Sequence, residues 1–332
     1  MIVKQLLSIL IPVYNASKWI ERCLESIVSL PEFIQFVRII CVDDGSSDTS
    51  LSILEKCKDK YGNLEIISRE NRGIGASRNE LLDHVKTPYF WFVDADDYIS
   101  SDSFSCIIPL LKQDKYDMLL MGYFWGNALG EGKDVLYGNE EYASGVELSD
   151  KGIFNNSLWT RVYRTSVAKS NNIHFRNYQM GEDFDFIFKM IPHLGKVKCI
   201  DKVLYYYIVN PNSAITAPSM EHKIRASEHS LQCMEENYAS LKSFPNNIQM
   251  VLRKPLNHFL MGYLYSVYVV PFTMKYKKVA FVRLKKMGAV PVSPLPDEKK
   301  KRMFSRIVNI GFLRGLSLYM DAFYLMLKNG NR

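Results

Sequence analysis

The chain has 332 residues, of which 47% are apolar, 13% aromatic and 23% charged, and its formal net charge is +7. This apolar content with a modest net charge excludes a disordered chain, and 18 Gly and 13 Pro exclude a collagen-like or low-complexity one. The length predicts one large or two moderate folded domains. The six cysteines form no C-x-x-C pair and the six histidines show no ligand spacing, so no zinc site is expected.

Positive charge is concentrated near the C-terminal end of the chain. Residues 251–332 hold 16 Lys and Arg against 3 Asp and Glu, whereas residues 1–250 hold 26 against 32. A basic segment of this kind is compatible with nucleic acid, an anionic membrane or another acidic partner. Charge alone does not choose among them.

The first hundred residues alternate short β-rich runs with helical patterns. Nearly continuous apolar or β-rich runs predict strands over Leu6–Val13, Val37–Val42, Leu64–Ile67 and Tyr89–Val93. Between these runs, apolar residues recur at helical spacing. The alternation predicts βαβ units, and therefore an α/β fold with a mainly parallel sheet and flanking helices.

Beyond Ser100 the pattern is mixed. It predicts a helix over Phe104–Leu111, a strand over Met118–Tyr123, a long loop or hairpin from Gly126 to Gly145, a helix beginning near Glu182 and a strand over Leu204–Val209. From about Ala217 the sequence is helical and aromatic. We therefore expect a first domain over residues 1–216 and a basic, mainly helical C-terminal region over residues 217–332.

Polar segments follow the predicted strands one after another. Tyr14 and Asn15 follow the first strand, residues 43–48 the second, residues 71–79 the third and residues 94–97 the fourth. Ligands of an open parallel sheet bind outside the carboxyl ends of its strands. The sequence therefore predicts one cleft that collects at least four carboxylates and two arginines.

Three carboxylates after the fourth strand, Asp94, Asp96 and Asp97, repel one another unless a cation neutralises them. A divalent cation with oxygen ligands is one interpretation. The other is a solvated turn in which Asp97 caps the next helix. Their position directly after an apolar strand favours the functional interpretation.

Two further motifs of the predicted cleft also have two interpretations each. Asp43 and Asp44 either form a polar turn or accept hydrogen bonds from a nucleoside. Arg78, near the start of a predicted helix, is a fixed cation that pairs with phosphate or holds Asp94 in place.

Glu182 and Asp183 lie far along the chain and open an amphipathic helix. The helix dipole alone favours acidic residues in a first turn. A functional role gains weight if this helix packs beside the cleft.

These motifs together resemble the ordered signature of family 2 glycosyltransferases with the GT-A fold, of the type that builds bacterial capsule, O-antigen or exopolysaccharide. The segments that carry the resemblance are residues 8–15, 42–48, 71–79, 92–97 and 182–183. The resemblance covers roughly residues 6–216. It implies a Rossmann-like sheet and a metal-dependent hexosyl- or N-acetylhexosaminyl-transferase.

The resemblance also implies roles for individual residues. The donor would be a nucleotide diphosphate sugar, most often UDP-linked. The residues implied to bind it are Pro12, Tyr14, Asp44, Arg78 and Asp94, and those in supporting positions are Asp43, Asp97 and Glu182. Asp96 would ligate Mn²⁺ or Mg²⁺, and Asp183 would be the catalytic base of an inverting transfer.

For the acceptor, the resemblance implies a hydroxyl of a growing, lipid-linked polysaccharide repeat unit. Two basic clusters, within 275–286 and 299–306, then favour an anionic membrane over nucleic acid, because no nucleic-acid module accompanies them. The apolar run Phe259–Phe272 is too short to span a bilayer comfortably. We expect a cytoplasmic protein that is peripheral on the inner membrane face.

Two alternatives belong to other functional classes. A non-catalytic nucleotide-sugar binding or scaffold protein would bind the donor but lack a working base. A sugar-1-phosphate nucleotidyltransferase would share the sheet and the metal, but it should carry a Gly-rich loop where this chain has residues 12–15. The shape of the pocket over residues 126–179 is expected to set the donor sugar and the acceptor.

Overall fold

The computed structural model describes residues 5–127, 129–209, 219–291 and 309, and the chain divides into two compact units. One unit comprises residues 1–177 and 182–217, and the other comprises residues 178–181 and 218–332. The predicted domains, 1–216 and 217–332, stay a prediction, because packing does not show whether each part folds alone. The basic cluster within 299–306 lies outside the described residues.

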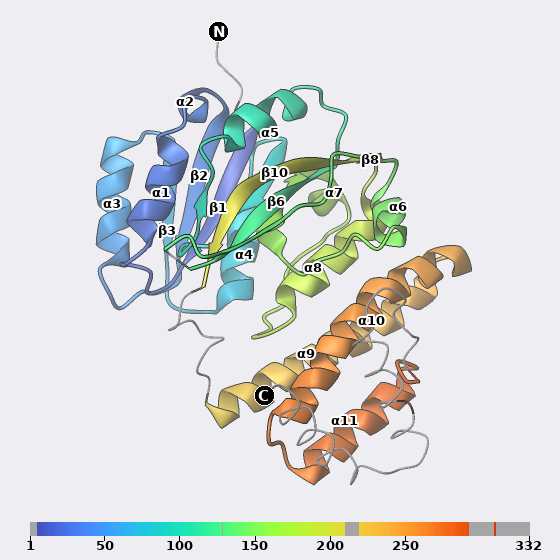
Figure 1. Cartoon of the computed structure of the whole chain (residues 1–332). Helices are drawn as coiled ribbons and strands as arrows, with labels where there is room; N and C mark the ends of the chain where they lie inside the picture. Colours follow the sequence, from blue (N-terminus) through green and yellow to red (C-terminus); the bar gives the residue numbers. More distant parts are fainter. Residues whose placement is uncertain (1–4, 128, 210–218, 292–308, 310–332) are drawn as a thin grey trace. The chain divides into compact units, whose positions relative to one another are not determined.

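The described residues of the first unit form one ten-stranded mixed sheet with flanking helices (Figure 1). The strands are β1 (Leu7–Val13), β2 (Val37–Asp43), β3 (Leu64–Ser68), β4 (Tyr89–Phe92), β5 (Tyr98–Ile99), β6 (Met118–Gly126), β7 (Gly132–Val135), β8 (Glu141–Tyr142), β9 (Arg161–Arg164) and β10 (Val197–Ile208). Their order is β3-β2-β1-β4-β9-β6-β10-β5, with β7 beside β6 and β8 beside β10.

The direction of the strands decides which side chains meet at one edge of the sheet. β1 to β4 are mutually parallel, and so are β6 and β10. β9 runs antiparallel to both β4 and β6, so β6 and β10 point the same way as β1. The prediction of a mainly parallel sheet is confirmed. The sequence analysis did not identify β9, because its four residues begin and end with arginine and form no apolar run.

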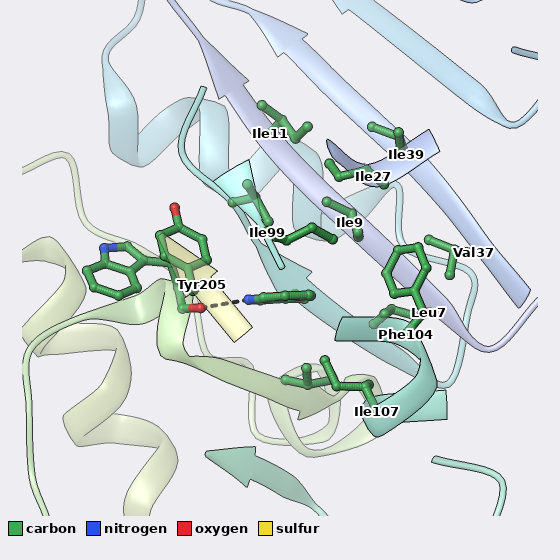
Figure 2. Close-up of a cluster of buried hydrophobic side chains, with 14 of the residues drawn as sticks. Leu7, Ile9, Ile11, Ile27, Val37, Ile39, Ile99, Phe104, Ile107 and Tyr205 are labelled. Atoms are coloured by element: carbon green, nitrogen blue, oxygen red, sulfur yellow. Dashed lines mark hydrogen bonds between the residues drawn. The ribbon is translucent and has the colours of Figure 1, made fainter. Parts of the chain in front are cut away.

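The helices of this unit cover both faces of the sheet. They are α1 (Ile20–Val28), α2 (Phe33–Phe36), α3 (Ser50–Lys60), α4 (Ile74–Asp83), α5 (Ser103–Leu111), α6 (Gly145–Asp150), α7 (Thr165–Ser170) and α8 (Glu182–Met190), with 3₁₀ turns η1 (Leu158–Thr160) and η2 (Ile191–His193). Figure 2 shows alternate residues of β1 packed with side chains of β2, α1 and α5. On the other face, Phe186 of α8 stacks on Phe175 and lies edge-on to Phe90 and Phe92.

The described part of the second unit is mainly helical, as expected. Its helices are α9 (Met220–Ser240), α10 (Asn246–Val269) and α11 (Met274–Lys286), with the 3₁₀ turn η3 (Leu241–Ser243). Arg283 of α11 forms ion pairs of 2.7 Å with Glu228 and Glu235 of α9. Among the described residues there is no helix whose length and apolar character would let it cross a membrane.

Candidate active site

The carboxyl ends of β1 to β4 bring four of the predicted polar segments to one edge of the sheet. Pro12 lies within β1, paired with Val42, and is buried. Tyr14, one residue beyond the strand, keeps 54% of its surface exposed. Of these two predicted nucleoside contacts, Tyr14 presents an open ring, whereas Pro12 is covered in this structure.

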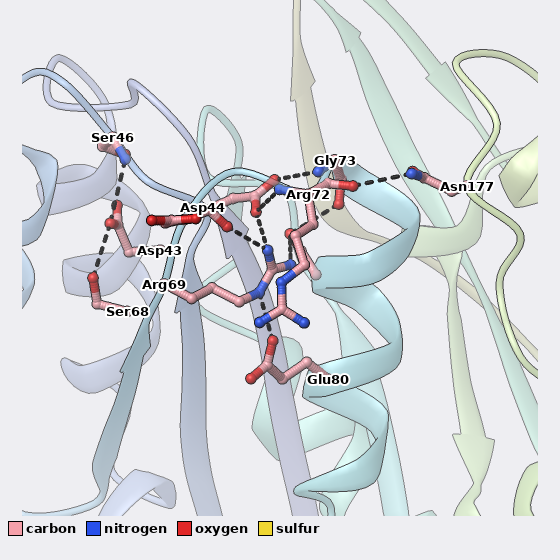
Figure 3. Close-up of polar contacts among 11 residues, drawn as sticks. Asp43, Asp44, Ser46, Ser68, Arg69, Arg72, Gly73, Glu80 and Asn177 are labelled. Atoms are coloured by element: carbon pink, nitrogen blue, oxygen red, sulfur yellow. Dashed lines mark hydrogen bonds and ion pairs between the residues drawn. The ribbon is translucent and has the colours of Figure 1, made fainter.

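Asp44 is the centre of a buried hydrogen-bond network (Figure 3). Its Oδ1 forms an ion pair with Arg69 and accepts a hydrogen bond from the N–H of Arg72 (2.9 Å). Its Oδ2 accepts a hydrogen bond from the N–H of Gly73 (2.8 Å). A carboxylate has about four lone-pair sites. The network occupies three of them, so one site on Oδ2 is left for a ligand donor such as a base imide.

The same network shapes the turn that leads into α4. Gly73 precedes the helix at φ 91°, a conformation that L side chains rarely adopt. Arg69 also pairs with Glu80 at 2.5 Å and donates to Ser77 at 3.0 Å. Arg69 was not predicted from the sequence. Its place directly after β3, at the same strand edge as Asp44, was the available signal.

Asp43, predicted as a supporting residue, is buried at the end of β2. Its Oδ2 accepts from the N–H of Ser46 (3.3 Å) and the hydroxyl of Ser68 (3.4 Å), as Figure 3 shows. Its Oδ1 is buried and has no hydrogen-bond partner among the described residues. An unpartnered carboxylate oxygen at a strand end is a candidate acceptor for a ligand hydroxyl.

Arg78 joins the two halves of the predicted site. Its buried guanidinium pairs with Asp183, with Glu182 at 3.1 Å and with Asp94 at 3.6 Å. It also lies over the ring of Phe175, 5.5 Å from the ring centroid. Arg78 thus holds Asp94, one of the two roles expected for it, and brings the first turn of α8 to the end of β4.

The protonation of Asp183 reflects this environment. Burial raises the pKa of its carboxyl to about 7, with Arg78 lowering it and the charges of Glu182 and Asp94 raising it further. The backbone of Leu158 in η1 also lowers this pKa slightly. A carboxyl group that titrates near neutral pH is suited to accept a proton from a substrate.

The three acids after β4 have different environments. Asp97 is buried, and its carboxylate accepts from the hydroxyl of Tyr205 (2.7 Å) and the N–H of Ile208 (2.9 Å). Burial raises its pKa well above the usual range. Asp97 therefore anchors the loop to β10, which is a supporting role. Tyr205 also accepts from the N–H of Asp94 at 3.1 Å, a contact that the sequence did not indicate.

Asp96 is the acid best placed to receive a cation. Burial and the charge of Asp94 raise the pKa of its carboxyl to about 6, and the carboxylate forms no ion pair within the described part of the chain. Arg22 instead donates to its carbonyl oxygen at 2.7 Å. The carboxylate oxygens of Asp96 are ligands of the kind that Mn²⁺ and Mg²⁺ prefer. Since no group of three or more potential ligand side chains occurs among the described residues, a cation would take further oxygens from the substrate.

Comparison with known proteins identifies the first unit. Residues 8–168 match the model of glycosyl transferase family 2. The chain contains a family 2 glycosyltransferase domain. This confirms the resemblance seen in the strand-end motifs, and it does not support the nucleotidyltransferase alternative. Asp183 lies beyond the matched residues.

Two bacterial relatives show how much of their length this chain matches. A poly(ribitol-phosphate) beta-glucosyltransferase of Bacillus spizizenii is 34% identical over 206 residues, which are 61% of this chain and 32% of that protein. The uncharacterized glycosyltransferase EpsJ of Bacillus subtilis is 27% identical over 251 residues, which are 73% of this chain and 70% of EpsJ. The match to the first relative thus spans about a third of its length.

A solved structure confirms the GT-A fold. Residues 1–349 of TarS from Staphylococcus aureus superpose with a TM-score of 0.72 and 20% identity, over 97% of this chain and 92% of that one. The same TarS fragment has been solved with UDP and with UDP-GlcNAc. At this identity the likeness shows the fold alone.

The raised pKa of Asp183 predicts a pH-dependent stability. With a folded-state pKa of about 7 and an unfolded pKa of ~3.9, the folded protein binds the extra proton between these values, so the free energy of unfolding falls as pH rises through that window. Asp183→Asn removes this titration. We expect the stability of the variant relative to wild type to increase from pH 4 to pH 8, measured by urea denaturation.

The matched control is Asp102→Asn, which removes an exposed carboxylate that pairs with Lys202. A stability difference between Asp183→Asn and wild type that does not change with pH would contradict the raised pKa.

Proposed function

We propose that this protein is an inverting glycosyltransferase that transfers a sugar from a UDP-linked donor to an acceptor hydroxyl, with Asp183 as the general base. The observation that carries the proposal is the shared ion-pair cluster of Arg78. It holds a base with a pKa of about 7 beside Asp94, at the strand edge where nucleotide-binding residues meet. A positioned base with a pKa near the working pH contributes ~10²–10⁴-fold to the rate.

The donor site is assigned to the ends of β1 to β3. Tyr14 offers an exposed ring for stacking on a base, and Asp44 keeps one acceptor site for a base imide N–H. The UDP and UDP-GlcNAc complexes of TarS support a nucleotide-sugar donor of this class. Asp94 and Asp43 then face the ribose or the sugar.

The metal is assigned to Asp96, with Asp94 beside it. Three carboxylates around Arg78 leave a net negative charge, and Asp96 adds another that no described cation pairs with. A bound Mn²⁺ or Mg²⁺ would stabilise the charge that develops on the departing diphosphate. Because the guanidinium of Arg78 is already engaged by acids, its proposed role is to position them.

The single base is consistent with inversion. In a direct displacement, the acceptor hydroxyl attacks the anomeric carbon from the face opposite the nucleotide, and its proton passes to Asp183. The ion pair with Arg78 orients the carboxylate for this transfer. Product stereochemistry, read by NMR of the anomeric proton, tests the inverting course.

We also propose that the acceptor is a lipid-linked saccharide and that the protein binds the cytoplasmic face of a membrane. The support is one face of α11. Its exposed residues, at helical spacing, are Lys275, Lys278, Val279, Val282, Lys285 and Lys286. Lysines that flank exposed apolar side chains suit an anionic lipid surface, where each contributes ~1 kcal/mol.

One prediction of the proposed reaction concerns the base. Asp183→Asn should lower sugar transfer by at least ~100-fold, because the proton acceptor is lost. UDP affinity, measured by calorimetry with Mn²⁺, should change little. Transfer is measured as nucleotide release and product formation with a panel of UDP- and GDP-sugars, and Asp102→Asn is the control. A wild-type protein that binds UDP but transfers no sugar to any acceptor would support the scaffold alternative.

A second prediction concerns the metal. In wild type, Mn²⁺ should raise the affinity for UDP. In Asp96→Asn, the increase in UDP affinity caused by Mn²⁺ should be about tenfold smaller, because a carboxylate ligand of the cation is lost. Calorimetric titrations of UDP with and without Mn²⁺ measure both. An undiminished Mn²⁺ effect in the variant would contradict the assignment, and unfolding midpoints show whether the variant remains folded.

The third prediction concerns α11. The double variant Lys278→Glu/Lys285→Glu should reduce cosedimentation with phosphatidylglycerol vesicles by about tenfold or more, because two charges are reversed and the net charge of this face falls by four units. The control is Lys56→Glu/Lys58→Glu, which makes the same change on exposed lysines of α3. Equal binding by both variants, or binding that is insensitive to salt, would contradict the role of this face.

A further inference from the structure

A row of aromatic side chains lies at the carboxyl ends of β6 and β10. Tyr205 is in register with Tyr123, and Tyr207 with Trp125. Because strand residues two apart share a face, these four side chains point to the same side of the sheet. Trp159 of η1 stacks on Tyr205 and Tyr207, with ring centroids 4.4 and 5.4 Å away, and meets Tyr123 edge-on at 4.8 Å.

The inner end of this row adjoins the reacting groups. The hydroxyl of Tyr205 bonds to the carboxylate of Asp97. Tyr207 is next along the row, two residues beyond Tyr205 on the same face of β10. The 3₁₀ turn η1, which carries Trp159, packs against α8, the helix that begins with Glu182 and Asp183. The row therefore begins beside the acids that follow β4 and near the helix that carries Asp183.

The outer end of the row is open. Trp125 keeps 46% of its surface exposed, with the ammonium of Lys133 5.8 Å from its ring centroid. Tyr123, Tyr207 and Tyr137 are half-buried, and the ring centroid of Tyr137 lies 6.5 Å from that of Tyr123. Trp159 and Tyr205 belong to the hydrophobic core and Tyr123 and Tyr207 pack against it, whereas Trp125 is exposed at the end of the row.

We infer that this aromatic row is the acceptor subsite and that it holds a pyranose ring of a saccharide acceptor. The inference rests on the proposed function and deepens it. The C–H groups on one face of a pyranose are apolar and weakly positive, so they pack on the negative face of an aromatic ring. The hydroxyls at the rim of the sugar remain free to reach Asp183.

The position of the row distinguishes the acceptor from the donor. The nucleoside candidates Tyr14 and Asp44 follow β1 and β2, whereas the row lies on β6 and β10. In the sheet, β4 and its acids stand between these two groups of strands. An inverting transfer requires the acceptor to approach from the side opposite the nucleotide. The row lies on the other side of β4 from the nucleoside candidates, which is compatible with such an approach.

The charges around the row favour a sugar ring over a polyol phosphate. The cations that act on these rings are Lys133, above Trp125, and Arg161, near Tyr137. Arg161 is buried and donates to Asn155, Ser157 and Thr160, so its guanidinium is already bonded. Of the two, Lys133 alone is exposed to meet a phosphate. Because the row offers several aromatic rings and one exposed cation, we assign the subsite to a pyranose.

Saturation-transfer difference NMR on the full chain tests the subsite without requiring catalysis. The probes are methyl β-D-glucopyranoside, methyl β-D-galactopyranoside and ribitol 5-phosphate. We expect saturation of ring C–H protons for at least one pyranoside and none for ribitol 5-phosphate. Trp125→Ala should reduce the pyranoside signal by about tenfold, and Trp125→Phe should restore most of it, because the phenyl ring keeps an aromatic face.

The control Ile34→Ala, which removes an exposed apolar side chain on α2, should bind like wild type. The inference is overturned if ribitol 5-phosphate alone binds, or if the pyranoside signal is unchanged in Trp125→Ala. It is also overturned if a UDP-hexose displaces the pyranoside while UDP does not, since the row then holds the donor sugar. Pyranoside binding without any sugar transfer would contradict the proposed reaction and leave the subsite standing.

Discussion

The site depends on one buried cation that three carboxylates share. The guanidinium of Arg78 cannot release its charge in a protein, and it lies too deep to be satisfied by water. It therefore requires acidic partners, which it finds in Asp94 at the end of β4 and in Glu182 and Asp183 at the start of α8. Two segments about ninety residues apart are held together by this requirement. The excess negative charge that results is what a divalent cation at Asp96 would offset.

The sheet topology decides how this cluster is approached. The antiparallel strand β9 separates β4 from β6 and leaves β6 and β10 pointing the same way as β1. All the carboxyl ends of these strands therefore meet at one edge. Along that edge, the nucleoside candidates occupy one side of the acids and the aromatic row occupies the other. A transfer reaction between two substrates needs this separation.

The acids at this end of the sheet differ in the groups that they contact. Asp97 and Asp44 are buried and bonded to backbone N–H groups, so they hold loops in place. Burial raises the pKa of Asp96 to about 6 and that of Asp183 to about 7, which is compatible with the roles proposed for them as cation ligand and proton acceptor. Figure 3 shows the buried carboxylate of Asp44 bonded to the turn that precedes α4.

Much was determined by the sequence itself. The apolar runs of β1 to β4 and the polar residues after them predicted the parallel sheet and its ligand edge, because strand periodicity and strand ends are local properties. The sequence alone did not determine that Asp97 is an anchor, that Arg69 holds Asp44, or that Trp159 stacks on Tyr205. Those contacts join residues 25 to 111 positions apart. Only the packing of the strands and of η1 in the folded sheet brings these residues into contact.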